Sequence, residues 1–331
     1  MHRYWRPPIN YLLLPFSGLY WSGLQVWYLY DKFRRKVKFD AFTIVVGNLT
    51  VGGTGKSPFV YLLAKTLREE FRVVVITRGY GRKSREPVVL SDKLLPVELT
   101  GDEPLMNFIK LERKVPFVVC KDRIEAYRIA KREFSPHVVI LDDAFQYRKV
   151  VPDFSFLVFD ERFFITSRFL LPAGPLREPL KAGERADAIV LNYKAGVPGE
   201  EKIYPDKPHI RLRYKPVALR RAGKIYDFDE IEREVAAFAG IGDPESFIKT
   251  LEGIGFKVKE FERFPDHYWY KLDEIKKILG IGLPVITTEK DYVKLPGSLK
   301  DRIYALVIEP EIVEGLEIIK GLKERIRDNI G

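Results

Sequence analysis

Cysteine is nearly absent from this sequence of 331 residues, which contains Cys120 alone. A single cysteine excludes an internal disulfide framework and a cysteine-based zinc site, and it is typical of proteins in a reducing cytosol. Histidine is also scarce, with four residues. The chain shows no internal repeat at solenoid spacing, no low-complexity tract and no zinc-finger or RNP-type pattern. We therefore expect no nucleic-acid partner.

The composition predicts a folded protein with an acidic ligand. Hydrophobic residues make up 46% of the chain, with only 22 prolines and 24 glycines, which excludes a disordered polymer. The length leaves room for about two domains. The net charge of +10 favours an acidic partner, such as a nucleotide, a phosphorylated substrate or an anionic membrane surface.

Residues 47–57 read Gly-Asn-Leu-Thr-Val-Gly-Gly-Thr-Gly-Lys-Ser and lie between an apolar run at 42–46 and a helical pattern at 59–70. This order predicts a strand, a glycine-rich turn and a helix N-terminus whose N–H groups surround phosphates. Threonine stands where such loops usually begin with glycine. A glycine turn without a ligand is the alternative. The expected phosphate-binding residues are Thr50, Gly52, Gly53, Thr54, Gly55, Lys56 and Ser57.

Residues 7–30 carry no charge. Basic residues flank them: Arg3, Arg6, Lys32, Arg34, Arg35, Lys36 and Lys38. Pro15, Gly18 and Gly23 interrupt an otherwise sufficient membrane-spanning length. Amphipathic aromatics favour the headgroup level: Trp5, Tyr11, Tyr20, Trp21, Trp27, Tyr28 and Tyr30. We expect a helix lying in the interface of an anionic membrane; a spanning helix, a signal peptide and a core-packed hairpin are the alternatives.

Apolar runs alternate with helical patterns after the glycine loop, which predicts an α/β fold of the P-loop NTPase type with a doubly wound, mostly parallel sheet. A weaker pattern around residue 206 separates a second, smaller α/β domain. The expected parts are 1–38, an N-terminal membrane-associated helical segment; 39–205, the P-loop core; 206–311, the second domain with an extended linker; and 312–331, a C-terminal helix that begins at Ile312.

Two further sequence features point to the same kind of site. Asp142 and Asp143 follow the apolar run 138–141, where a P-loop protein holds Mg²⁺; ordinary turn aspartates are the alternative. Three prolines stiffen the loop at 170–180, so Arg177 and Glu178 would have a fixed geometry suited to a phosphate; a solvated surface pair is the alternative. The pattern leaves the role of His267 open between a packed residue and a functional one.

Several short motifs occur in one order along the chain, at 46–58, 78–80, 101–104, 142–143, 171–179, 266–267 and 288–291. Together they resemble the tetraacyldisaccharide 4′-kinase family of lipid A biosynthesis. The resemblance implies ATP-dependent, Mg²⁺-assisted phosphorylation of the 4′-hydroxyl of an acylated glucosamine disaccharide 1-phosphate. It also implies a monotopic enzyme at the cytoplasmic face of the inner membrane, with two domains that close over the nucleotide.

Residue roles follow from the resemblance by position. Asp102 would accept the proton of the sugar hydroxyl while His267 orients it. Lys56 and Ser57 would contact the phosphates and Mg²⁺, with Asp142 or Asp143 completing the metal site. Further nucleotide or substrate contacts would come from Arg78, Tyr80, Arg177 and Glu178. One position departs from the family pattern, because Tyr147 stands where a histidine is usual, and tyrosine cannot become cationic near neutral pH.

Two other function classes remain open from the sequence. A membrane-associated P-loop ATPase switch that recruits partners would explain the paired glycines and the N-terminal segment. It would have no need of Asp102 or His267. A soluble small-molecule kinase with a hydrophobic hairpin is the third reading. The sequence leaves the oligomeric state and the acyl-chain preference open.

Overall fold

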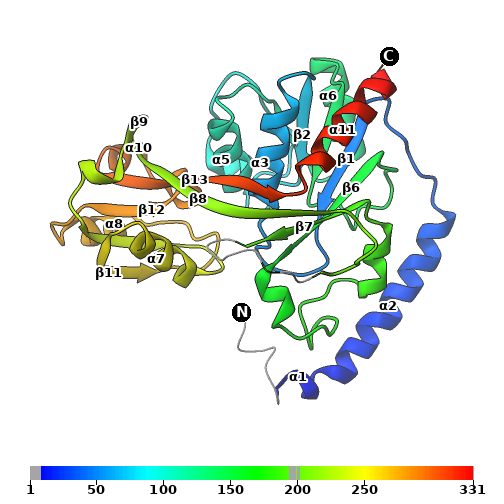
Figure 1. The fold of residues 1–331 in the computed structure, drawn as a ribbon, viewed down its shortest axis with the longest axis horizontal. Helices are drawn as coiled ribbons and strands as arrows, with labels where there is room; N and C mark the ends of the chain where they lie inside the picture. Colours follow the sequence, from blue (N-terminus) through cyan, green and yellow to red (C-terminus); the bar gives the residue numbers. More distant parts are fainter. Residues whose placement is uncertain (1–8, 194–198, 200–201, 331) are drawn as a thin grey trace.

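The computed structural model describes residues 9–193, 199 and 202–330, so the predicted flanking residues Arg3, Trp5 and Arg6 lie outside the described part. One mixed, mostly parallel sheet of 13 strands runs through this part, in the order β11-β10-β12-β13-β8-β7-β6-β1-β5-β2-β4-β3, with β9 paired to β8 (Figure 1). The strands are β1 (Phe42–Gly47), β2 (Val73–Thr77), β3 (Val88–Leu90), β4 (Phe117–Val119), β5 (Val138–Asp142), β6 (Phe154–Asp160), β7 (Ala188–Asn192), β8 (His209–Arg221), β9 (Lys224–Tyr226), β10 (Glu234–Ala239), β11 (Lys257–Arg263), β12 (Val285–Thr288) and β13 (Ile303–Glu314).

Helices cover both faces of this sheet, so the predicted α/β class with a mostly parallel sheet is confirmed. The α-helices of the described part are α1 (Ile9–Leu12), α2 (Leu14–Phe33), α3 (Lys56–Leu67), α4 (Val97–Thr100), α5 (Asp102–Lys110), α6 (Arg123–Phe134), α7 (Pro244–Gly253), α8 (Leu272–Leu279), α9 (Glu289–Tyr292), α10 (Gly297–Lys300) and α11 (Leu316–Ile330).

Alternating side chains of β1 show how the core around the glycine loop is built. Phe42, Ile44 and Val46 enter a core with side chains of α3, α5 and α11. Val45 faces the opposite core, which contains side chains of α6. Because both faces are covered, the strand is a continuous apolar run, as expected for a parallel strand between two helical layers.

Two lobes share the sheet (Figure 1). The first lobe contains β1 to β7, and the second contains β9 to β12 with α7 and α8. The long strands β8 and β13 pair antiparallel from Ala305↔Arg220 to Glu314↔Arg211 and connect the lobes. The domain division at residue 206 remains a prediction.

The start of the C-terminal helix was predicted wrongly at Ile312. That residue pairs with Leu212 in the sheet, and the helix α11 begins only at Leu316. The apolar residues at the end of β13 resemble the first turn of an amphipathic helix, whereas pairing with β8 keeps the backbone extended. The helix then returns to the first lobe, where Ile319, Leu322 and Ile326 enter the core.

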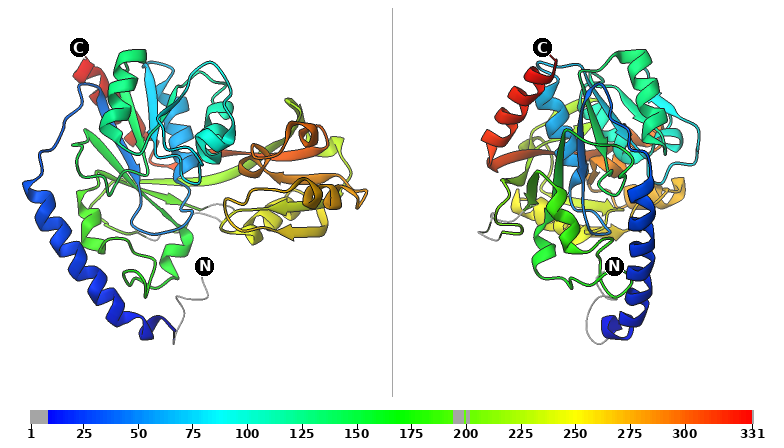
Figure 2. Two further views of the ribbon diagram at one scale, coloured as in Figure 1. Left: turned by 180° about the vertical axis from the view of Figure 1, so that it is seen from behind. Right: turned by 90° about the vertical axis from the view of Figure 1, so that its right-hand side faces the viewer.

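Helix α2 runs along the outer side of the first lobe, and an extended segment connects it to β1 (Figures 1 and 2). Pro15 lies in its first turn, a position that needs no backbone N–H donor. Among the residues that the structure describes, no helix combines the length and the apolarity needed to cross a membrane.

Candidate active site

The glycine loop connects β1 to α3, as the sequence predicts. Gly55 lies directly before α3 with φ +84°, and a Cβ atom there would lie 1.6 Å from the Asn192 side-chain nitrogen. Only glycine fits this position. Thr50 occupies the position where such loops usually begin with glycine. Its backbone pairs with Leu176 in an antiparallel bridge, and this extended conformation does not require glycine. The loop is thus anchored on one side by the proline-rich loop at 170–179.

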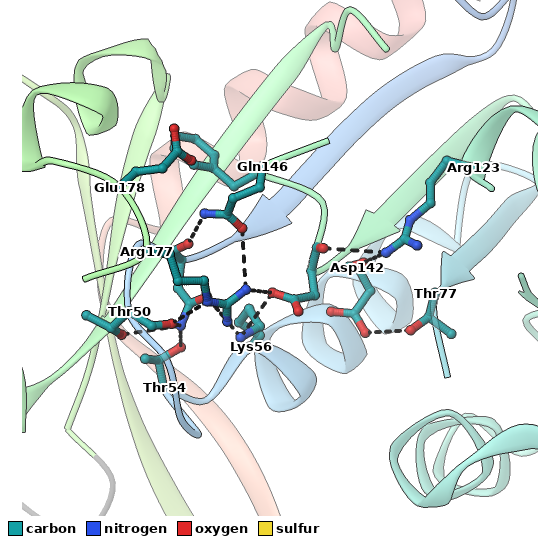
Figure 3. A network of polar contacts seen from close by, with 12 residues as sticks. Thr50, Thr54, Lys56, Thr77, Arg123, Asp142, Gln146, Arg177 and Glu178 are labelled. Carbon is teal, nitrogen blue, oxygen red and sulfur yellow. Dashed lines mark hydrogen bonds and ion pairs between the residues drawn. The ribbon is translucent and has the colours of Figure 1, made fainter. Parts of the chain in front are cut away.

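Two cations converge next to the glycine loop (Figure 3). The Lys56 ammonium lies 3.1 Å from Asn48 Oδ1 and 3.3 Å from Asp143 Oδ1. The Arg177 guanidinium donates to the same Asn48 oxygen at 3.1 Å and to the Thr50 carbonyl at 3.0 Å, and it lies 3.5 Å from Asp143 Oδ1. Burial raises the pKa of Asp143, but the charges of Lys56 and Arg177 outweigh it and hold the pKa below its ordinary value. A phosphate group bound here would lie next to the positively charged groups of Lys56 and Arg177.

Asp142 lies at the carboxyl end of β5, next to Val46 of β1 in the sheet register. Its Oδ2 atom accepts a hydrogen bond from Thr77 at 3.1 Å, while its buried Oδ1 atom has no hydrogen-bond partner in the described part of the chain (Figure 3). Burial, with the neighbouring Asp143 and Glu103 carboxylates, raises the pKa of Asp142 from 3.8 to about 7. The charge of Lys56 and the Thr77 hydrogen bond lower the pKa of Asp142, but burial and the two carboxylates outweigh them.

These residues fit Mg²⁺, which prefers oxygen ligands and retains several water molecules. The Asp142 Oδ1 atom is a suitable metal ligand. The Ser57 hydroxyl, directly after Lys56 at the start of α3, is a second suitable ligand. No group of three or more histidine, cysteine or carboxylate side chains within residues 9–193, 199 and 202–330 could hold a metal ion. Nucleotide phosphate oxygens and water would therefore have to supply the remaining ligands.

Asp102 and His267 form a pair across the two lobes. Gly101 has φ +85° and directs the chain into α5, which begins at Asp102. The Asp102 side chain is buried, and its Oδ2 atom lies 2.9 Å from His267 Nδ1. The Tyr80 ring lies beside the imidazole, with 5.0 Å between the ring centroids. The predicted pair therefore lies within hydrogen-bond distance.

Lys290 lies at the other ring nitrogen of His267. Its ammonium lies 3.3 Å from His267 Nε2 and also 3.3 Å from Glu103 Oε1. Burial lowers the pKa of Lys290, but the carboxylates of Glu103, Asp102 and Asp266 outweigh burial and raise it above 10.5. An ammonium can only donate, so a hydrogen bond from Lys290 to Nε2 is compatible with the neutral tautomer that carries its proton on Nδ1, toward Asp102.

The phosphate side and the Asp102 side of the site touch each other. The Ser57 hydroxyl donates to the carboxylate of Glu103, the residue that follows Asp102. Asn107 of α5 donates to the Ser57 carbonyl at 3.1 Å. Glu103 also keeps a depressed pKa, because Lys290 and the Ser57 hydroxyl outweigh the effect of burial. A phosphate donor on the loop and an acceptor hydroxyl at Asp102 would therefore be neighbours.

A cavity of about 270 Å³ lies beside the glycine loop. The loop at 50–54 lines it from the first lobe, and Ile241, Gly242 and residues 264–266 line it from the second. Both lobes therefore line this cavity.

Three predicted contacts lie in different surroundings. Arg78 and Tyr80 follow β2 and are exposed, close to Arg123 and His267 respectively. Glu178 points away from the phosphate site (Figure 3). Its buried carboxylate accepts hydrogen bonds from Tyr28 of α2 at 2.8 Å and from Arg185 at 2.7 Å. In this structure Glu178 therefore binds the N-terminal helix, and its contact with a nucleotide or substrate remains a prediction.

Tyr147, which departs from the family pattern, donates a hydrogen bond to Asp122 at 3.0 Å. Asp122 is the N-cap of α6 and accepts from the backbone of Ile124 at 2.8 Å. Tyr147 therefore supports the start of a helix.

Sequence reasoning assigned no role to several residues of the site, namely Asn48, Glu103, Gln146, Lys290 and Lys294. Asn48 links Lys56 to Arg177, and Gln146 donates to the Asn48 carbonyl at 2.8 Å (Figure 3). Lys294 lies 3.9 Å from Asp102 Oδ2. The spacing of Lys290 and Lys294 by one helical turn was the available signal, since it puts two cations on one face.

Comparisons with known proteins agree on one family. The model described as tetraacyldisaccharide-1-P 4′-kinase matches residues 9–327. Tetraacyldisaccharide 4′-kinase of Aquifex aeolicus is 40% identical over 95% of this chain and 98% of its own length. The enzyme of the same name from Bradyrhizobium diazoefficiens is 37% identical over 88% of this chain and 85% of its own length.

A solved structure agrees with the sequence relatives. The crystal structure of LpxK from Aquifex aeolicus in complex with ATP matches with a TM-score of 0.82 and 38% identity, covering 96% of this chain and 99% of that one. The resemblance carried by the motifs is thereby confirmed. The chain belongs to the tetraacyldisaccharide 4′-kinase family.

Proposed function

We propose that this protein is a kinase that transfers the γ-phosphoryl group of ATP to the 4′-hydroxyl of a tetraacylated glucosamine disaccharide 1-phosphate in lipid A biosynthesis. One observation carries the proposal: the Ser57–Glu103 hydrogen bond joins the phosphate-binding loop to the Asp102–His267 pair. An ATPase switch needs the loop but not a pair that activates an alcohol. Membership of the family supports the same substrate class.

Each side chain has a role that follows from its place. Lys56 and Arg177 neutralise negative charge on the β- and γ-phosphates as the bond to the leaving ADP breaks. Asp102 accepts the proton of the sugar hydroxyl as its oxygen bonds to the γ-phosphorus. His267, with its proton on Nδ1 and Lys290 at Nε2, holds the Asp102 carboxylate in place. Mg²⁺, when bound by Ser57 and Asp142, with Asp143 beside them, would add positive charge at the phosphates.

Helix α2 exposes a stripe of apolar side chains. Leu19, Val26 and Phe33 of α2, with Leu12 at the end of α1, recur every seven residues and are 69–83% exposed. Polar residues of α2 instead face the protein, where Ser17 and Asp31 are buried. This is the reverse of a helix on a soluble protein, whose apolar stripe faces the core.

We infer that this apolar stripe lies in the surface of an anionic bilayer. Lys32 and Arg35, exposed at the end of α2, would attract anionic headgroups. A substrate whose acyl chains remain in the bilayer requires an enzyme docked on that bilayer. The cytoplasmic face of the inner membrane is the location that fits an ATP-dependent reaction.

Vesicle flotation with phosphatidylglycerol-containing liposomes tests the docking. The variant L19E/V26E should lose about tenfold or more in partition, because two apolar contacts are lost and two anionic groups are added. The matched control is I225E, since Ile225 is 57% exposed in the second lobe. Equal flotation of L19E/V26E and I225E would refute docking through this stripe.

The kinase assay separates the two function classes. Incubation with ATP, Mg²⁺ and the acylated disaccharide 1-phosphate in mixed vesicles should give a lipid product with a second phosphate. Consumption of ATP should depend on that acceptor. ATP hydrolysis that ignores the acceptor and rises with a protein partner would instead support the switch.

A further inference from the structure

Three side chains on the inner face of α2 bind one loop. The Ser17 hydroxyl donates to the Leu170 carbonyl at 2.9 Å and accepts from the Ala173 N–H at 3.1 Å. The Tyr20 hydroxyl donates to the Arg177 carbonyl at 2.8 Å, and the Tyr28 hydroxyl donates to Glu178 Oε2 at 2.8 Å. Hydrogen bonds thus connect α2 to both ends of the loop at 170–178.

That loop delivers Arg177 to the phosphate site. The Arg177 N–H donates to the Leu49 carbonyl at 2.7 Å, and the Val51 N–H donates to the Pro175 carbonyl at 2.9 Å. The main chain of Arg177 is therefore held from both sides, by the glycine loop at its N–H and by Tyr20 at its carbonyl. Its guanidinium then reaches Asn48 and the Thr50 carbonyl.

We propose that Tyr20 and Tyr28 are positioning residues of the nucleotide site, which hold Arg177 in place for the ATP phosphates. Helix α2 is then a structural part of the phosphate site as well as the lipid-docking element. The inference rests on the proposed function, because it requires that ATP phosphates bind at Lys56 and Arg177. Phenol groups suit this role, because burial and the Glu178 carboxylate raise the pKa of both tyrosines and keep their hydroxyl groups protonated as donors.

The test is ATP-site affinity without lipid. Isothermal titration of the full chain with Mg²⁺ and the non-hydrolysable analogue AMP-PNP should show about five- to twentyfold weaker binding for Y20F/Y28F, as expected for the loss of two hydrogen bonds that hold a phosphate ligand. The matched control is Y30F, because Tyr30 lies on the same helix, is 60% exposed and makes no hydrogen bond within the described residues. Y30F should bind like the wild type.

A double-mutant cycle distinguishes positioning from general stability. R177A should weaken binding by about ten- to a hundredfold, and Y20F/Y28F should add no further loss in the R177A background, because the tyrosines act through Arg177. Y20F alone repeats the cycle if the double variant does not fold. Wild-type affinity in folded Y20F/Y28F and Y20F, or equal losses with and without Arg177, would overturn the inference. Failure of the wild type to bind AMP-PNP would instead refute the proposed function.

Discussion

Replacing Asp142 by asparagine should stabilise the ligand-free protein while abolishing its activity. The Asp142 side chain is half-buried, its buried Oδ1 atom has no hydrogen-bond partner among the described residues, and its pKa is raised from 3.8 to about 7. At 1.36 kcal/mol for each pH unit, this difference corresponds to at most ~4 kcal/mol of lost folding free energy when Asp142 is ionised. Relaxation of the site and its partial access to water reduce the figure, so we expect about 1–2 kcal/mol for D142N.

The sign of the pH dependence is fixed by the direction of the shift. Because the pKa of Asp142 is higher in the folded state, the folded state binds more protons between pH 3.8 and about 7, and the Asp142 contribution to stability falls as pH rises through that window. Asparagine does not titrate, so D142N does not lose stability in this way. The difference in free energy of unfolding between D142N and the wild type should be absent near pH 3.5, increase through the window and reach its full value above about pH 8.

Thermal unfolding by circular dichroism at several pH values measures this effect. Near pH 8, without nucleotide or Mg²⁺, the Tm of D142N should exceed that of the wild type by about 1–3 °C. T77V is a useful companion, since it removes the hydrogen bond that the Thr77 hydroxyl donates to the Asp142 side chain and should lower stability. A D142N protein less stable than the wild type at pH 8, or equally shifted at every pH, would refute the reasoning.

Three further predictions concern the site and the core. K56M should raise KM for ATP and lower kcat. D102N and H267A should lower kcat by about 10²–10⁴-fold, with ATP affinity within about twofold of wild type. Near-normal turnover of either variant would show that the residue has no catalytic role. Phe59 is fully buried, with its ring centroid 4.9 Å from that of Phe156, so F59A should cost about 3–5 kcal/mol in urea unfolding, and I225A, at an exposed position, almost nothing.

Local patterns predicted the strand, glycine turn and helix of the candidate phosphate site. A strand, a glycine turn and a helix lie within residues 42–67, so the position of Lys56 depends on contacts close in sequence. Asp142 was predictable because the carboxyl ends of parallel strands meet at one edge, and β5 is in fact the neighbour of β1.

The remaining features depend on contacts distant in sequence. Glu178 follows Arg177 directly, yet its carboxylate binds Tyr28, about 150 positions earlier in the chain. Lys290 reaches Glu103 and His267 only because the second lobe folds back on the first. The sheet that joins the lobes arises from the pairing of β8 with β13, which no turn between adjacent strands specifies.

The most direct test of the central claim is to locate the transferred phosphate. The wild-type protein is incubated with ATP, Mg²⁺ and tetraacylated disaccharide 1-phosphate in anionic vesicles, and the lipid product is examined by ³¹P and ¹H NMR. The proposal predicts a second phosphomonoester coupled to the proton at the 4′ carbon, and its loss in D102N. A product phosphorylated elsewhere, or release of inorganic phosphate with the lipid unchanged, would contradict it.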